Sequence, residues 1–148
     1  MVFTRRLPDG FVITDRRSVL DIDAIHRFLA EESYWARHRT RAITEAAIAG
    51  SLCIGLYTPD GTQAGFGRVI TDRATMAHLS DIFVLPPYRG GGHGQAIVEG
   101  LLFHPALRSV RRWSLSTADA HALYARYGFE PYLEPEKQMI RMVPPPTA

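Results

Sequence analysis

The sequence has 148 residues, and at roughly 100 to 200 residues per domain this length predicts a single compact domain. Its hydrophobic fraction of 46% and its charged fraction of 22% are close to globular averages, which excludes a disordered, collagen-like or coiled-coil chain. The one cysteine, Cys53, excludes an intrachain disulfide and a cysteine-rich zinc site. A formal net charge of +2 is too small to favour nucleic acid as a partner.

The sequence carries no sign of a membrane segment or a secretory signal. No apolar run approaches the roughly 18 residues that a membrane span needs, and Met1–Gly10 is not followed by an apolar stretch. We therefore expect a cytoplasmic protein with neither a membrane nor a nucleic-acid partner. The domain is expected to cover residues 1–143, with a flexible proline-rich tail at 144–148.

Two helices are predicted before the first long strand. Either Ser18 or Asp21 can cap a helix whose apolar residues recur at helical spacing as far as Glu32. A second helix is predicted from Thr40, and Gly50 is its stop signal. The segment between the two helices is expected to be a loop.

The pattern then changes to that of a three-stranded meander. The predicted strands are Leu52–Tyr57, Ala64–Thr71 and about Met76–Val84. A turn signal at Thr58–Gly61 joins the first two strands, and the prolines after Leu85 end the third strand because they lack backbone donors.

The remaining elements alternate between helix and strand. After a glycine cluster, the sequence predicts a helix ending near His104, a short strand at Arg112–Ser116, a helix at Asp119–Tyr127 ended by Gly128, and a last strand at Lys137–Val143. Helices and strands that alternate after an antiparallel start predict an α/β protein with a mixed sheet.

The glycine cluster at residues 90–94 is the segment with the clearest chemistry. A strand that stops, several glycines and a helix that begins at once leave unpaired backbone N–H groups at the positive end of the helix, where an anion such as phosphate binds. The Gly-Lys-Ser/Thr of a P-loop is absent, as is the full dinucleotide-binding fingerprint. A flexible loop between strand and helix is the alternative reading.

Two motifs together resemble those of the GNAT superfamily of acyl-CoA N-acyltransferases. The first is Arg89-x-x-Gly92-x-Gly94, preceded by a Val-x-Pro-x-Tyr strand exit, which resembles the pyrophosphate-binding motif of that family. The second motif, Ala120-x-x-Leu123-Tyr124-x-x-x-Gly128-Phe129, is similar to the late helix and turn of the family. They occur in the family's order, about 30 residues apart.

The resemblance implies a mixed, mostly antiparallel sheet of about six to seven strands, flanked by about four helices. In that fold acetyl-CoA lies in a splay between two central parallel strands. The backbone near Phe83 and Val84 would pair with the pantetheine amides, and Arg89 would either reach a phosphate or brace the loop. The pyrophosphate would lie on the N–H groups of Gly90, Gly91, Gly92, His93, Gly94 and Gln95. Thr117 stands where the family often has asparagine, and could still form one hydrogen bond with the pantetheine arm.

For catalysis, the resemblance places Tyr124 near the sulfur, as the acid that protonates the leaving thiolate; a helix tyrosine that only packs on the cofactor is the alternative. Asp81, His78 or a water chain could act as the base. In a regular strand Asp81 and His78 face opposite sides, and a bulge near Asp81 would reverse which of them faces the cleft. His78 has the more suitable ordinary pKa, whereas an acid in an apolar strand needs a partner or a task. Either residue could instead be structural, with Asp81 supporting a neighbouring loop.

The acceptor site is expected near the end of the first helix. Glu31 and Glu32 could attract a cationic amine, and Tyr34 and Trp35 could stack on it; alternatively the aromatic rings anchor the loop and the glutamates are solvated. The basic stretch Arg37–Arg41 is either a solvated face or a contact for a phosphate. No metal site is expected. The resemblance therefore implies an N-acetyltransferase that uses acetyl-CoA on a primary amine of a small molecule or peptide, with a homodimer as the candidate oligomeric state. A non-catalytic acyl-CoA-binding module is the alternative.

Overall fold

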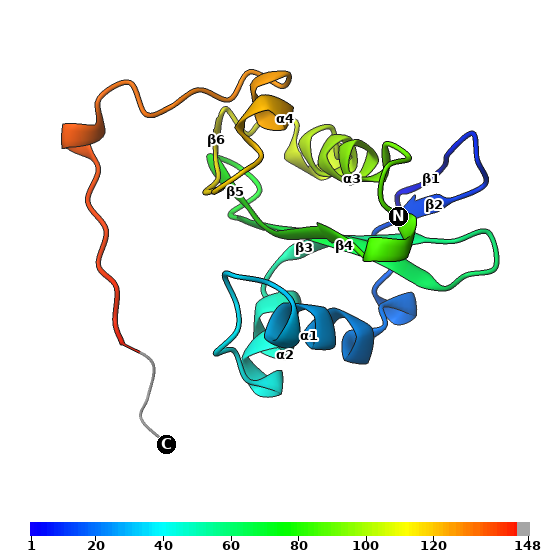
Figure 1. The fold of residues 1–148 in the computed structure, drawn as a ribbon. Helices are drawn as coiled ribbons and strands as arrows, with labels where there is room; N and C mark the ends of the chain where they lie inside the picture. Colours follow the sequence, from blue (N-terminus) through cyan, green and yellow to red (C-terminus); the bar gives the residue numbers. More distant parts are fainter. Residues whose placement is uncertain (145–148) are drawn as a thin grey trace. The chain divides into compact units, whose positions relative to one another are not determined.

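The structure is a computed structural model that describes residues 1–144, and it contains two compact units (Figure 1). The first unit, residues 1–116, holds the whole sheet and the helices α1 to α3. The second unit begins at Thr117 and holds the short helix α4. No helix within the described residues is long and apolar enough to cross a membrane.

The first unit is built on a six-stranded sheet whose spatial order follows the chain. Its strands are β1 (Thr4–Arg6), β2 (Val12–Thr14), β3 (Leu52–Tyr57), β4 (Gln63–Thr71), β5 (Met76–Val84) and β6 (Arg112–Ser114). Every neighbouring pair is antiparallel except β5 and β6, which are parallel. The predicted mixed, mostly antiparallel sheet is confirmed. The parallel pair, however, lies at one end of the sheet and not in its centre.

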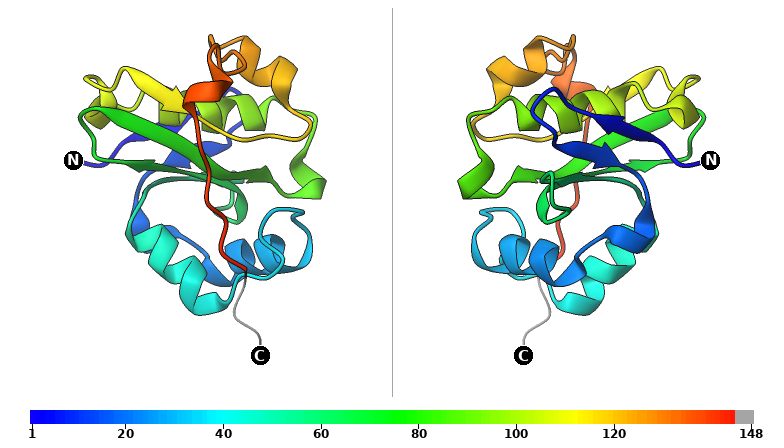
Figure 2. Two further views of the ribbon diagram at one scale, coloured as in Figure 1. Left: turned by 90° about the vertical axis from the view of Figure 1, so that its left-hand side faces the viewer. Right: turned by 90° about the vertical axis from the view of Figure 1, so that its right-hand side faces the viewer.

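Helices cover both faces of this sheet. Helices α1 (Ile22–Glu31) and α2 (Arg41–Ala49) lie on one face and α3 (His93–Leu102) on the other (Figures 1 and 2). Of the two candidate caps for α1, the structure uses Asp21, whose side chain accepts a hydrogen bond from the backbone of Ala24. The helix ends are therefore set by the local signals visible in the sequence.

An apolar core fills the space between α1, α2 and the sheet. Its buried members are Ile25, Phe28, Leu29, Ala36, Ile48, Cys53, Phe66 and Phe83. The rings of Phe28 and Phe83 stack with their centroids 4.1 Å apart. This contact holds the end of β5 against α1.

Glycines in β4 allow α3 to approach the opposite face closely. A Cβ atom on Gly67 would lie 2.8 Å from Ile97 of α3, and one on Gly65 would lie 2.8 Å from the backbone oxygen of Phe83. Both distances are too short for any larger residue without a shift. The small residues thus set the spacing between β4, β5 and α3.

A β-bulge interrupts β5. Phe66 pairs with Phe83, but Arg68 pairs with Ser80, so Gly67 alone faces Asp81 and the residue after it. Asp81 has a φ of 53°, a conformation unusual for a non-glycine residue.

Several sequence expectations were wrong. The predicted last strand, Lys137–Val143, is absent from the described chain, where Pro135–Lys137 forms a 3₁₀ turn and the following residues have no regular structure. Met139 and Ile140 are 99% and 84% exposed. A segment with alternating apolar residues forms a strand only where it pairs with the edge of a sheet. The sequence pattern did not predict the hairpin of β1 and β2. The predicted tail lies almost wholly outside the described residues.

Candidate active site

An open backbone edge runs along the last half of β5. Strands β5 and β6 pair at Met76 with Arg112, at Ala77 with Trp113 and at His78 with Ser114, and β6 then ends. Strand β5 continues to Val84, so within the described part of the first unit its β6-side edge from Leu79 onward has no neighbouring strand. Phe83 and Val84 lie at the far end of this edge. An extended molecule with amide groups can add to such an edge as a strand would.

The glycine loop follows this edge directly. Gly90 and Gly92 have φ values of 89° and 78°, and Gly92 is the N-cap of α3. The first N–H groups of α3 have no helical partner and lie at its positive end, so the loop and Gln95 offer a cradle for an anion. Arg89 donates from Nε to the Val84 carbonyl over 2.8 Å, which is the bracing contact of the two roles expected for it. The residues present therefore fit a pyrophosphate group.

Both ring nitrogens of His93 contact groups of the protein itself, so the side chain is not placed to bind a ligand. Its ring is buried, with Nδ1 2.7 Å from the Tyr88 carbonyl and Nε2 2.7 Å from Asp9 Oδ2. The ring also stacks on Phe11 at 4.1 Å. The His93 side chain therefore has a structural role, and its backbone N–H remains part of the cradle. Nothing in the sequence pattern pointed to Asp9 as its partner.

Asp81 accepts hydrogen bonds from three side chains. Arg39 Nη1 lies 2.5 Å and Arg68 Nε 2.7 Å from its Oδ2, and Trp35 Nε1 lies 2.7 Å from its Oδ1. Burial would raise the pKa of the Asp81 carboxyl, but the hydrogen bonds and charges of Arg39 and Arg68 outweigh it and hold that pKa below its ordinary value. These contacts favour the alternative in which Asp81 supports the neighbouring loop.

His78 lies on the same face of β5 as Asp81. Arg68 bonds to both Ser80 and Asp81, and His78 is two residues before Ser80 in the regular part of the strand. The bulge therefore places both candidate bases on one side, contrary to the expectation for a regular strand. His78 Nδ1 lies 2.8 Å from Ser114 Oγ. Burial, and then the charge of Arg68, lower the pKa of His78 below its ordinary value, so its ring is neutral at pH 7.

The expected acceptor residues lie in the loop after α1. Trp35 is 40% exposed although its indole nitrogen is bound to Asp81, and Tyr34 meets it edge to face at 5.0 Å. Glu32 is exposed at the C-cap of α1. In the basic stretch, Arg37 donates to the Ser33 carbonyl. In the same stretch, Arg39 donates to the carboxylate of Asp81. Arg41 donates to the carboxylates of Asp23 and Glu45. These arginines are engaged within the protein, so the stretch is not a free basic patch.

A family model described as an acetyltransferase (GNAT) domain matches residues 49–131, which is more than half of the chain. The chain belongs to the GNAT acetyltransferase family. The match covers the meander, the open edge of β5, the glycine loop and the late motif around Tyr124.

Individual relatives agree with this GNAT assignment. A protein of Gibberella zeae assigned as an acetyltransferase, FG08082, is 32% identical over an alignment covering 85% of this chain and 82% of that protein. N-alpha-acetyltransferase 80 of Mus musculus is 29% identical over 65% of this chain, which spans only 34% of the mouse protein. The crystal structure of a protein of Xanthomonas campestris pv. campestris assigned to the GNAT family is 47% identical, with a TM-score of 0.87 over 90% of this chain and 94% of that one.

The second GNAT motif lies wholly in the second unit. Tyr124 belongs to α4 (His121–Ala125), and its ring meets Phe129 edge to face at 5.8 Å. Thr117 Oγ1 accepts a hydrogen bond from the Ala120 backbone at 3.0 Å, so it caps the turn before α4. Gly128 has a φ of 87°, which explains the glycine at the end of the motif. Helix α4 is shorter than the sequence predicted.

Proposed function

We propose that this GNAT protein transfers the acetyl group of acetyl-CoA to a primary amine of a small molecule or peptide. One observation carries the proposal: the open edge of β5 leads directly into the glycine cradle of α3. The pantetheine amides pair with the backbone at Phe83 and Val84, and the pyrophosphate accepts hydrogen bonds from the N–H groups of residues 90–95. The name of the mouse relative refers to N-alpha-acetylation, so a peptide amino terminus falls within the proposed acceptor class.

The reaction requires one proton acceptor and one proton donor. The protonated amine gives one proton to the acceptor, its nitrogen then attacks the thioester carbon, a C–N bond forms and the C–S bond breaks. The nitrogen releases its second proton as the amide forms, and this proton replaces the one that the donor gives to the thiolate. An alkylamine has a pKa of about 10.4, so it must lose a proton before it attacks at pH 7. We assign this proton to Nε2 of His78, with Nδ1–H donating to Ser114; the neutral ring supports this assignment. Asp81 is left out of this step because three donors already occupy its carboxylate.

Tyr124 is the proposed donor to the leaving thiolate. Its phenol, with an ordinary pKa of about 10, is protonated at neutral pH, and its place in the late GNAT motif supports this role. Trp35 and Tyr34 form the wall against which the amine lies, held by the bond from Trp35 to Asp81. Glu32 supplies a negative charge at the end of α1.

A thiol-release assay with a panel of amines tests the function. Wild-type protein is expected to release CoA from acetyl-CoA with at least one amine. Tyr124→Phe is expected to lower kcat by about 100-fold while the KM for acetyl-CoA changes little, whereas the matched variant Tyr127→Phe keeps kcat close to wild type. CoA binding without turnover across the whole panel would favour the non-catalytic acyl-CoA-binding alternative. Unchanged kcat in Tyr124→Phe would refute the acid role.

A further inference from the structure

The ring of His93 is buried and contacts several parts of the chain, although the residue lies beside a glycine loop. It is 7% exposed and contacts three segments: the Tyr88 carbonyl before the glycines, Asp9 between β1 and β2, and the Phe11 ring. The function proposed above uses only the backbone of His93. The side chain therefore has a set of contacts that the function does not yet explain.

Both ring nitrogens of His93 face hydrogen-bond acceptors. A backbone carbonyl can only accept, so Nδ1 must carry a hydrogen to bond to Tyr88. The hydrogen bonds from His93, first, and from the Phe11 backbone hold the pKa of Asp9 below its ordinary value, so its carboxylate is ionised and also accepts. The two bonds together require a doubly protonated imidazolium ring, whereas a neutral ring can donate only one of them.

The same ring fixes the shape of the glycine turn. A Cβ atom on Gly91 would lie 2.9 Å from Cε1 of His93, so the ring packs directly on the Gly91 backbone. The bond to Tyr88 spans the glycines from one end to the other. Glycine backbones lose the most conformational entropy on ordering, and a clamp across them reduces the number of loop shapes that compete with the anion cradle.

We propose that His93 and Asp9 form a positioning pair, in which the doubly protonated ring clamps the glycine loop in the shape that receives the pyrophosphate of acyl-CoA. This inference rests on the proposed function, because it takes the loop as the acyl-CoA site. The groups that face the ring are Asp9, the Tyr88 carbonyl and the uncharged Phe11 ring.

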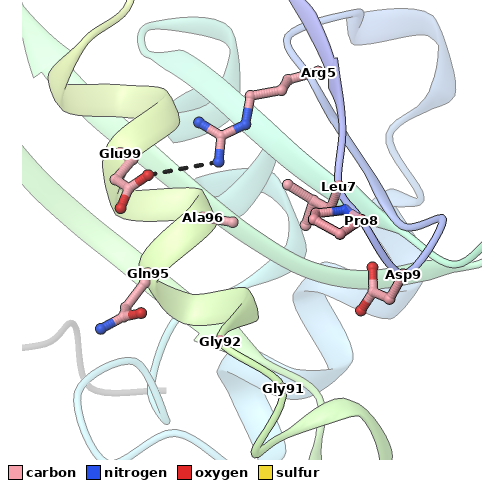
Figure 3. Close-up of a pocket in the computed structure, with 9 residues that line it drawn as sticks. All are labelled: Arg5, Leu7, Pro8, Asp9, Gly91, Gly92, Gln95, Ala96 and Glu99. Atoms are coloured by element: carbon pink, nitrogen blue, oxygen red, sulfur yellow. Dashed lines mark ion pairs between the residues drawn. The ribbon is translucent and has the colours of Figure 1, made fainter.

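The other charged groups beside His93 and Asp9 form an ion pair with each other. Arg5 and Glu99 line the same pocket of about 300 Å³ as Asp9 and pair with each other at 3.5 Å (Figure 3). Asp9 is therefore the counter-ion of the ring. The clamp, and with it the affinity for CoA, is expected to be strongest at low pH, where the ring can carry both hydrogens, and to weaken at high pH, where it carries only one.

Calorimetric titration with CoA at about pH 5.5 and about pH 8.5 tests the pair. His93→Leu is expected to raise the Kd for CoA at least tenfold at the lower pH and by a smaller factor at the higher pH. The 3′-phosphate of CoA titrates in the same range for both proteins, so it cancels in the ratio of variant to wild-type Kd. Asp9→Asn keeps the side-chain volume but removes the counter-charge of the ring, and it is expected to raise the Kd for CoA at the lower pH. Asp60→Asn is the control and keeps the wild-type Kd, because the Asp60 carboxylate bonds only to its own turn, at Thr58 and Thr62.

Nitrogen NMR of the free protein supplies a second measurement that does not depend on CoA. At about pH 5.5 the His93 ring is expected to show hydrogens on both nitrogens in wild type, as its two hydrogen bonds require. Equal CoA affinities in wild type, His93→Leu and Asp9→Asn, or a His93 ring with a single N–H at the lower pH, would overturn the inference. Failure of wild-type protein to bind CoA at all would instead overturn the proposed function, and the NMR result would still decide whether the clamp exists.

Discussion

Asp81 illustrates how a single residue connects several parts of the site. Its positive φ lies within the bulge of β5. Its carboxylate connects β4, through Arg68, to the loop between α1 and α2, through Arg39 and Trp35. The sequence indicated that an acid in an apolar strand needs a partner. It could not indicate which of 16 arginines would be that partner, because these contacts are separated by more than ten residues in the chain.

Asp81→Asn tests how much this network of hydrogen bonds contributes to the free energy of unfolding. The substitution leaves the buried guanidinium of Arg68 and the partly buried one of Arg39 without their shared counter-charge, and breaking a buried pair in this way costs about 3–5 kcal/mol. Denaturant unfolding is expected to show a free energy of unfolding reduced by that amount. Asp60→Asn, at an exposed carboxylate, should cause a clearly smaller change. Equal effects of the two variants would contradict a structural role for Asp81.

Cys53 offers a second test at the residue scale. Burial, only partly offset by the charges of Arg17 and Arg68, raises the pKa of the Cys53 thiol to about 11. We expect the native protein to be inert to thiol reagents at about pH 8 and to react once unfolded in denaturant. Rapid labelling of the native protein would contradict the burial of Cys53. Inertness also means that the protein's own thiol does not interfere with the detection of released CoA.

At the scale of elements, β5 organises the proposed site. One edge of the strand pairs with β4, the other is open after His78, and its end is held by α1 through Phe83 and by the loop that begins α3. Strand β4 packs closely on β5 because Gly65 and Gly67 have no side chains.

Gly65→Ala is expected to disturb this arrangement. Its Cβ would lie 2.8 Å from the Phe83 backbone oxygen, which cannot rotate away as a side chain can, and overpacking of this kind costs about 1–3 kcal/mol. Thermal unfolding should show a lower Tm, and the affinity for CoA should fall because β5 shifts. Gly50→Ala is the matched control, since its nearest neighbour lies at 3.5 Å. A Gly65→Ala protein as stable as Gly50→Ala would contradict the packing argument.

The sequence predicted the elements of the fold better than their pairing. Caps such as Asp21 and Thr40, and the alternation of apolar residues in β3 to β5, are local signals, and the structure follows them. The exact bulge, the partner of His93 and the absence of a strand at residues 137–143 within the described chain depend on contacts between distant segments. Periodicity alone does not report such contacts.

At the scale of the whole molecule, the small net charge of +2 agrees with a site that binds an anion mainly through backbone groups. The glycine loop supplies N–H groups at the start of α3, and Arg37 and Arg39, in the loop between α1 and α2, bond to groups of the protein itself. A near-neutral chain can therefore bind a polyanionic cofactor without a basic surface.

Acyl-CoA is proposed to bind along the open edge of β5 and on the glycine loop. Amide hydrogen exchange with and without CoA tests this proposal most directly, because it reports each backbone segment separately. We predict that exchange slows in residues 79–84 and 90–95 and stays unchanged in the β3–β4 turn around Asp60. CoA binding that leaves both of these segments unprotected would contradict the account.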